Sequence, residues 1–397
     1  MSIKKWIGMG LCGLIAGTGV TFAQGDMMAQ IDEAFKAGTL KGNLGVNYIN
    51  LDVENGFHES VAAGFVELEY MTGSYEGLQL GIDVLGVGEL LDDENAVALD
   101  FPGYYNNDDM DAILRELYVK YSMMNSDIVV GRHQPMVAPM LDGTAYEGVT
   151  LNIGEWTDMG LMVCVSAFNR WIDDATWDDG VDDWQDVETG DTGDILYSVM
   201  ANVEVMDKMV DVKPYLVYQA DAATVYGIQA AMDYEIEGGM VGATFDYYFV
   251  SEDVGNAAIT DDSSAWKLYV SGEMEGASAG IGYFQYSDDG NQLGAQGLLD
   301  DLDVMDDEIM EMAGVNFTTQ GAEVWWIDLG YKWEGLTLAA QYGNFEDDNT
   351  WDYDQWMLKA TYDVTESFQA MAEYIEGDDD DLGFEPTMIQ IYGVYKF

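Results

Sequence analysis

The sequence predicts an all-β protein, a transmembrane antiparallel β-barrel of about 18 strands with short periplasmic turns and long acidic extracellular loops. Three observations predict it. Segments of about ten residues alternate an apolar face with a face that is not apolar, and the connections between them alternate short and long. The chain is also rich in glycine (45), tyrosine (25) and tryptophan (11), with only 5 prolines. Period-two alternation over about ten residues is typical of a strand that meets lipid on one side.

The first 23 residues have the pattern of an export signal. Lys4 and Lys5 precede a short apolar stretch, and small residues stand before a cleavage site after Ala23. A membrane anchor helix is the alternative, but the apolar stretch is short and interrupted by glycine. Residues 24–38 are then an N-terminal periplasmic segment, in which 24–37 are expected either to form a short amphipathic helix at the periplasmic mouth or to be disordered. Residues 39–397 are the barrel.

Eighteen strands follow from the alternation of apolar and polar residues in the mature chain. The predicted strands cover residues 39–51, 61–71, 77–86, 112–122, 126–132, 145–156, 158–170, 194–205, 210–218, 224–236, 240–251, 263–275, 277–286, 322–333, 335–345, 353–364, 367–376 and 387–397.

The connections predict the orientation of the barrel. After even-numbered strands they are short, as at 72–76, 157 and 276, whereas after odd-numbered strands they are mostly long, as at 87–111 and 287–321. Only the connection at 219–223 breaks the pattern, because it follows an odd-numbered strand and is short. Short turns on one rim, long loops on the other and an even number of strands are typical of an outer-membrane barrel with both termini in the periplasm.

The two faces of each strand predict which side chains meet lipid. In the strand that ends at Trp333, residues Trp325, Ile327 and Leu329 share one face. The opposite faces carry charged side chains, which are expected to line the lumen; those chosen as candidates are Lys267, Asp328, Lys332 and Lys359. A soluble core could produce the same pattern. The last strand favours the membrane, because Tyr395 and Phe397 resemble the terminal aromatic assembly signal of outer-membrane barrels.

Charge is distributed unevenly along the chain. Acidic residues number 74 against 14 Lys and Arg, giving a formal charge of −60, which excludes a nucleic-acid partner because phosphate binding needs clustered cations. The loop-side connections hold 44 of the acids and no Lys or Arg. An acidic extracellular vestibule is therefore expected, formed by residues such as Asp173, Asp174, Asp178, Asp179, Asp300, Asp301, Asp306, Asp307, Asp378, Asp379 and Asp380.

The acidic vestibule predicts a porin for passive diffusion of ions and small hydrophilic solutes that selects cations, because a field of one sign concentrates counter-ions within roughly a Debye length of about 8 Å. Two other interpretations stay open. The acids could serve solvation in a saline habitat, or bind Ca²⁺ or Mg²⁺ and so link the loops to lipopolysaccharide. A structural or adhesive barrel whose acidic loops bind divalent cations, lipopolysaccharide or a partner is the alternative function.

Four segments resemble the OprD-type outer-membrane porins, including the related major porins of Campylobacter-like bacteria. They are 31–38, 114–121, 130–134 and 146–151. The resemblance implies an 18-stranded barrel, often a homotrimer, embedded in outer-membrane lipid, whose third loop folds inward to narrow the pore. That loop is 133–144 in this chain. Arg132 is the first candidate for the constriction, with Asp142 facing it; Glu116 and Lys120 are further candidates for the lumen.

The sequence offers little support for an enzyme or a cofactor. His58 and His133 are both expected in loops, and neither has a serine or cysteine motif around it. Cys164 lies between two valines of a predicted strand, where a packed or lumen-facing thiol is expected rather than a nucleophile. No cofactor is expected, and the acidic loops lack the spacing of a dedicated calcium loop, so the metal ligands are unknown.

Overall fold

The chain forms one closed barrel in the computed structural model. The structure describes residues 24–53, 58–92, 111–135, 145–154, 160–172, 185–186, 195–206, 209–219, 223–252, 262–287, 321–347, 352–379 and 385–397. The described elements are α2 (Gln24–Lys36), β1 (Thr39–Val53), β2 (His58–Met71), β3 (Leu78–Asp92), β4 (Asp111–Met123), β5 (Ser126–His133), β6 (Ala145–Ile153), β7 (Met162–Ile172), β8 (Gln185–Asp186), β9 (Leu196–Val205), β10 (Val210–Gln219), β11 (Ala223–Ile236), β12 (Gly239–Glu252), β13 (Ser263–Met274), β14 (Ala277–Tyr286), β15 (Glu323–Trp333), β16 (Leu336–Glu346), β17 (Asp352–Thr365), β18 (Phe368–Asp379) and β19 (Pro386–Lys396).

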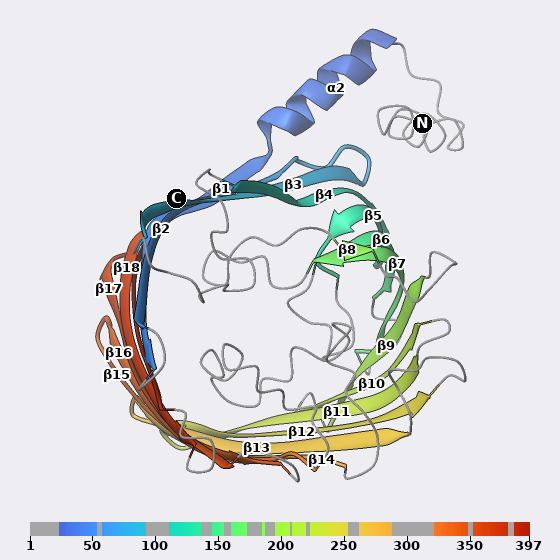
Figure 1. Cartoon of the computed structure of the whole chain (residues 1–397). Coiled ribbons are helices and arrows are strands. Elements are labelled where there is room, and N and C mark those ends of the chain that lie inside the picture. Colours follow the sequence, from blue (N-terminus) through green and yellow to red (C-terminus); the bar gives the residue numbers. More distant parts are fainter. Residues whose placement is uncertain are drawn as a thin grey trace.

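Eighteen of these strands form a ring in which every neighbour is antiparallel (Figure 1). β1 pairs with β2 on one side and with β19 on the other, and β7 pairs directly with β9. The two-residue β8 pairs only with β7, within a segment that the sequence predicted as a loop. The predicted 18-stranded antiparallel barrel is therefore confirmed. Among the described residues, no helix has both the length and the apolar character to cross a membrane.

Several strand ends differ from the prediction by three residues or more. β2 begins at His58 and β3 continues to Asp92, because pairing with a neighbouring strand extends each of them beyond the predicted ends at 61 and 86. β6 ends at Ile153 and β7 begins at Met162, so the single-residue link at 157 is wrong. His133 belongs to β5 rather than to the following loop. Asp378 and Asp379 belong to β18, because pairing with β17 continues through both of them.

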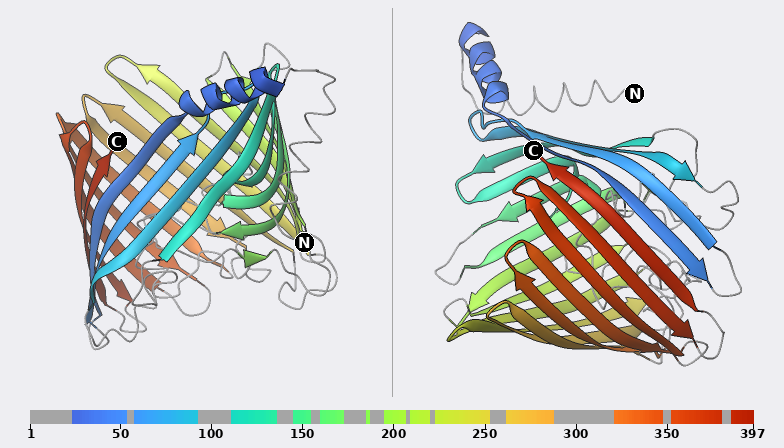
Figure 2. Two further views of the ribbon diagram at one scale, coloured as in Figure 1. Left: turned by 90° about the horizontal axis from the view of Figure 1, so that it is seen from above. Right: turned by 90° about the vertical axis from the view of Figure 1, so that its left-hand side faces the viewer.

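The outer face is apolar along most of the wall, as expected for a surface in contact with lipid. In β15, Trp325, Ile327 and Leu329 are exposed outwards, whereas Val324 and Trp326 are buried on the inner side. The last residue completes the wall, because the backbone N–H of Phe397 donates to the carbonyl of Gly42 (3.0 Å) and the N–H of Gly42 donates back (3.1 Å). The strands are tilted relative to the barrel axis, as Figure 2 shows and as closure of a sheet into a barrel requires.

The helix α2 leaves the barrel at the end where the short turns lie and projects beyond the ring of strands (Figures 1 and 2). The C-terminal end of the helix is hydrogen-bonded to the end of β2 and to the connection between β2 and β3. The backbone N–H of Gly73 donates to the carbonyl of Ala34 (2.8 Å), and the Tyr70 hydroxyl donates to that of Phe35 (2.5 Å). These donors satisfy carbonyls that a helix C-terminus leaves without partners.

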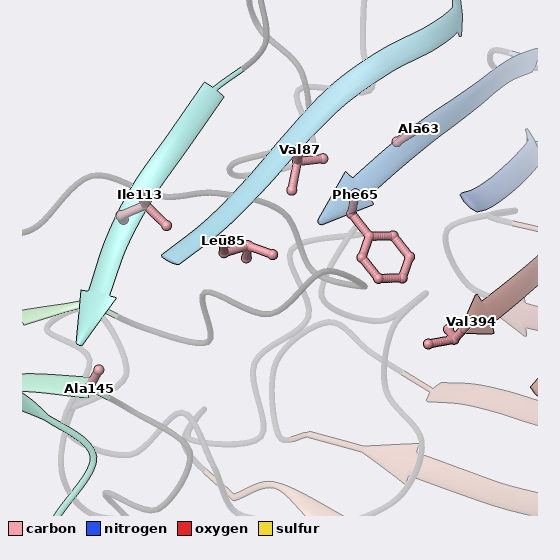
Figure 3. Close-up of a cluster of buried hydrophobic side chains, with 7 residues drawn as sticks. All are labelled: Ala63, Phe65, Leu85, Val87, Ile113, Ala145 and Val394. Carbon is pink, nitrogen blue, oxygen red and sulfur yellow. The ribbon is translucent and has the colours of Figure 1, made fainter. Parts of the chain in front are cut away.

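The inner face divides into two zones along the barrel axis. Towards the long-loop rim the inward side chains are apolar and buried, and we call this zone the inner apolar band; it includes Leu51, Ala63, Leu85, Val225, Val250, Val324 and Phe345. One of its clusters combines residues from β2, β3, β4, β6 and β19 (Figure 3). Charged inward side chains lie nearer the short-turn rim. The sequence did not predict this division.

Glycines on the inner face let large aromatic rings lie flat against the wall. Gly282 pairs with Tyr269 on one side and Trp326 on the other, and the two rings stack with an angle of 9° between their planes, 6.0 Å apart. A Cβ at Gly282 would overlap the indole ring. The two stacked rings thus cover the inner side of β14 at the position where Gly282 has no side chain.

We expect Gly282→Ala to lower the free energy of unfolding by about 1–3 kcal/mol, because the buried Trp326 ring must move. Gly272→Ala is the matched control, since the nearest atom to its added Cβ is the carbonyl oxygen of Met240 at 3.7 Å. Urea unfolding in detergent, followed by tryptophan fluorescence, measures both variants. Equal losses for the two would contradict the packing argument.

Candidate functional site: the inner charged wall

Charged side chains of neighbouring strands meet on the inner face in the half of the barrel nearer the short turns. On one side, β1 to β5 contribute three cations, each close to a carboxylate: Lys41, Arg115 and Lys120. On the opposite side of the ring in Figure 1, β10 to β13 contribute lysines around one aspartate. Between them, β15 to β18 add the Lys359–Glu373 pair together with Asp328 and Lys332. We call this zone the inner charged band; its members include Lys41, Glu67, Glu69, Asp83, Arg115, Glu116, Lys120, Asp127, Lys213, Asp246, Lys267, Asp328, Lys332, Lys359 and Glu373.

The centre of the first group is Arg115, which binds two carboxylates. Its Nε and Nη2 donate to Oδ2 of Asp83 at 2.8 and 2.5 Å, and Nη2 also donates to Glu67. Glu67 in turn accepts from the side chain of Asn43. The carboxylates of Asp83 and Glu67 have only 4% and 12% of their side-chain surface exposed, so the guanidinium neutralises charge that water reaches poorly.

A β-bulge allows Arg115 and its neighbour Glu116 to act on the same side of the wall. β4 pairs Glu116 with Asp83 and Ile113 with Leu85, so two residues of β4 stand opposite the single residue Val84. A bulge interrupts the alternation of side chains. Without it, adjacent residues would point to opposite faces, and either Arg115 or Glu116 would meet lipid.

Carboxylates outnumber cations in this part of the inner charged band. Asp83 stands in register between Glu69 on β2 and Glu116 on β4. Glu67, Glu69, Asp83 and Glu116 are thus four acids around the guanidinium of Arg115, and we call this group the Arg115 cluster. Lys41 reaches only the end of the row, at 3.7 Å from Glu69, and its side chain is largely exposed. The cluster therefore presents net negative charge to the lumen.

Three further cations of the band are placed beside carboxylates. Lys267 lies 3.6 Å from Asp246, Lys359 lies 2.9 Å from Glu373, and Lys120 lies 3.1 Å from Asp127. In each of the first two pairs the partners face each other directly in the strand register. Local pairing of this kind offsets the positive charge of these three lysines.

The root of the third loop is attached to the same wall. The backbone N–H of Gln134 donates to Oε1 of Glu116 at 2.8 Å. Next to it, His133 is buried, with Nδ1 3.0 Å from the carbonyl oxygen of Gly131 and Nε2 2.8 Å from the hydroxyl of Thr150. The hydroxyl of Thr150 lies 3.0 Å from that of Ser166, which lies 3.7 Å from the thiol of Cys164.

Sequence reasoning missed this buried polar chain. It placed His133 in a loop and treated Cys164 as an isolated residue. The signal that could have revealed the chain is the alternation itself, since Thr150, Ser166 and Cys164 occupy the face opposite the exposed Val149 and Val165. These hydrogen bonds join β5, β6 and β7 and fit a structural role, because every polar atom named in them has a partner.

Most of the predicted lumen residues lie on the inner face. Glu116, Lys120, Lys267, Asp328, Lys332 and Lys359 all do, and Asp328 accepts from Gln341 at 2.9 Å. Arg132 does not: it follows the alternation of Ile128 and Val130, whose side chains are exposed on the outer face. The prediction that Arg132 lines the constriction is wrong, because His133 takes the inward position in β5. Asp142 lies outside the described residues.

The predicted vestibule lies mostly outside the described residues; these positions are Asp173, Asp174, Asp178, Asp179, Asp300, Asp301, Asp306, Asp307 and Asp380. Asp379 is fully buried in the strand β18 and so is not a loop residue. The predicted assembly residues Tyr395 and Phe397 are exposed with their rings 6.3 Å apart. Within the described ranges, no group of His, Cys, Asp or Glu side chains has the arrangement of a metal site.

Comparisons with known proteins agree with this architecture. A BenF-like porin from Pseudomonas fluorescens shares 14% identity with a TM-score of 0.72, over 91% of this chain and 99% of that one. OccAB4 from Acinetobacter baumannii has 14% identity and a TM-score of 0.71, over 91% and 98% of the two chains. OpdK from Pseudomonas aeruginosa, solved with vanillate, has 15% identity and a TM-score of 0.69, over 90% and 99%. No curated protein sequence matches the chain.

The family model described as Gram-negative porin matches residues 11–382, which is most of the chain. Together with the closed 18-stranded barrel, this match confirms the resemblance to OprD-type porins that the sequence carries. The chain belongs to the Gram-negative porin family and is a β-barrel porin of the outer membrane.

Proposed function

We propose that this porin conducts ions and small hydrophilic solutes by passive diffusion and that it prefers cations. The single observation that carries the preference is the Arg115 cluster, in which four carboxylates lie around one guanidinium on the inner face and two of them bind it. Lys120, Lys267 and Lys359 each lie beside a carboxylate of their own and so offset little of this charge.

The size of the effect follows from Coulomb's law. A carboxylate about 10 Å from a passing cation in water changes the energy of that cation by about 0.4 kcal/mol, which is about twofold in local concentration. Each uncompensated carboxylate attracts K⁺ and repels Cl⁻ about twofold, so two or three of them favour K⁺ over Cl⁻ by roughly 15- to 60-fold. Low-dielectric walls increase the effect further.

The other functional assignments are part of the same proposal. The acidic loops form a vestibule that adds to the cation preference and binds Ca²⁺ or Mg²⁺ together with lipopolysaccharide. Residues 1–23 are a signal peptide that is cleaved on export. The mature protein assembles as a homotrimer. These proposals rest on the composition of the loops, the N-terminal sequence pattern and the resemblance to OprD-type porins.

A planar-bilayer recording tests the proposal. The purified protein is inserted into a neutral bilayer with a tenfold gradient of KCl, and the reversal potential is measured. We expect a potential of the sign that K⁺ permeation gives. A reversal potential at zero or of the chloride sign would contradict cation preference, whereas a folded barrel that conducts no ions would contradict the diffusion porin itself.

A further inference from the structure

The helix α2 lies outside the ring of strands, at the level of the short-turn rim. In Figure 1 it runs from β1 past the outer side of β3, and in Figure 2 it runs across the barrel axis rather than along it. The helix therefore points away from the opening of the pore. In a membrane it extends over the lipid that surrounds the barrel.

The C-terminal end of α2 is attached to the lipid-facing side of the wall. Tyr70 follows Leu68 on the outer face of β2 and pairs with Leu40 of β1, and both leucine side chains are exposed there. The Tyr70 hydroxyl donates to the carbonyl of Phe35, and a Cβ at Gly38 would overlap the Tyr70 ring. The last turn of the helix is thus hydrogen-bonded to an outward aromatic side chain, on the lipid side of β2.

Outward aromatic side chains mark the membrane boundary at this rim. Trp333 is the last residue of β15, and Tyr362 and Tyr395 lie close to the ends of β17 and β19; all three are exposed. Tryptophan and tyrosine gather where a membrane protein meets the boundary between lipid and water. Tyr70 is the last residue but one of β2, so it occupies the same level. The attached end of α2 therefore lies at the boundary between lipid and water.

The helix has an apolar side and a polar side. Ile31 and Phe35 share one side because they are four residues apart, and 49% of Phe35 is exposed. Gln30 and Glu33, three residues apart, share the other side and are exposed. The sequence continues the apolar spacing with two methionines, three and four residues before Ile31. The exposed Phe35 adjoins the outward side chains of β1 and β2, so the apolar side of α2 continues the lipid-facing surface of the barrel.

The charges of α2 indicate the kind of surface that its apolar side meets. The helix contains three acids, Asp26, Asp32 and Glu33, and one base, Lys36, which pairs with Asp32 at 2.5 Å. An anionic surface would repel this excess of acid, and the helix of a second copy would bring the same charges. A zwitterionic phospholipid surface carries no net charge, so burial of apolar side chains can supply the affinity.

We infer that α2 lies in the headgroup region of the periplasmic leaflet and binds a zwitterionic phospholipid surface through its apolar side. Ile31 and Phe35 enter the lipid, while Gln30 and Glu33 face water. A helix with one apolar and one charged side typically lies in the plane of the interface, with its apolar side at the boundary between headgroups and acyl chains. Which ions the pore prefers does not affect this inference.

Fluorescence quenching in phosphatidylcholine vesicles tests the inference. In the full chain without its two native cysteines, a small fluorophore is attached to Ile31→Cys or Phe35→Cys on the apolar side, or to Gln30→Cys or Glu33→Cys on the polar side. We expect a nitroxide on the acyl chain near the headgroup to quench the first two labels several-fold more than the second two, and iodide in the water to do the reverse. Equal quenching at all four positions would overturn the inference. So would labels at Ile31→Cys and Phe35→Cys that neither quencher reaches, because protein would then cover the apolar side.

Two matched variants, each with the label at Ile31→Cys, provide a second measurement. Phe35→Asp places a charge on the apolar side and should lower quenching by the lipid nitroxide several-fold, whereas Glu33→Gln on the polar side should leave it unchanged. Because burial rather than charge supplies the affinity, quenching in the Glu33→Gln variant should be the same in 0.1 M and 1 M KCl. Heat-modifiable migration and ion conductance show that each barrel is folded. Quenching that survives Phe35→Asp, or that disappears at 1 M KCl, would refute binding of α2 to lipid through its apolar side.

Discussion

Arg115→Leu is expected to lower the free energy of unfolding of the barrel by about 3–5 kcal/mol, the cost of removing one partner from a buried ion pair. The guanidinium binds Asp83 and Glu67, and both carboxylates are largely shielded from water. Without Arg115 the two carboxyl groups would lose the cation that binds them and would be left beside Glu69 and Glu116, with the exposed Lys41 near the end of the row. Repulsion among the four acids adds to the loss.

Equilibrium unfolding by urea in detergent measures the effect, with tryptophan fluorescence as the signal. Lys41→Leu is the matched control: it also removes a cation from the inner charged band, but its pair with Glu69 is exposed, so a loss of about 0–1 kcal/mol is expected. Arg115→Lys should lie between the two, because an ammonium keeps the charge and loses the forked geometry. Equal losses for Arg115→Leu and Lys41→Leu would contradict the role of burial.

The architecture of the barrel was predictable because its physical signals are local. Period-two alternation, glycine at turns and the regular change from short to long connections identify each strand without knowledge of its partner. All 18 strands form, and errors concentrate at strand ends such as the end of β3 and the beginning of β7. The two-residue β8 gave no signal, since two residues cannot show a period.

The inner wall was less predictable, because its features depend on the register between strands. The Arg115 cluster needs the bulge opposite Val84, and no property of residues 114–116 alone shows that this bulge exists. The inner apolar band was missed for a related reason. When both faces of a strand end are apolar, as at Leu85 and Val87, alternation disappears and the sequence does not say which face is the lumen. For Arg132, sequence reasoning relied on position beside the third loop instead of on alternation.

The second large effect concerns where cation preference originates, in the wall or in the vestibule. We expect Glu69→Gln combined with Glu116→Gln to lower the permeability ratio of K⁺ to Cl⁻ several-fold, in both 0.1 M and 1 M KCl. These two side chains flank Asp83 on the inner face, and our proposal places permeating ions close to them. Screening over about 3 Å at 1 M salt leaves such close contacts partly effective.

The matched control is a vestibule variant in which Asp300, Asp301, Asp306 and Asp307 become asparagine. It removes more charge than the wall variant, from a loop that the sequence predicts at the extracellular mouth, where we expect ions to pass farther from each carboxylate. Its effect should therefore appear at 0.1 M, where the Debye length is about 10 Å, and vanish at 1 M. Reversal potentials of both variants at the two salt concentrations separate the cases. If the vestibule variant alone changes selectivity, the wall is not the filter, and the Arg115 cluster then serves the stability of the barrel rather than the choice of ion.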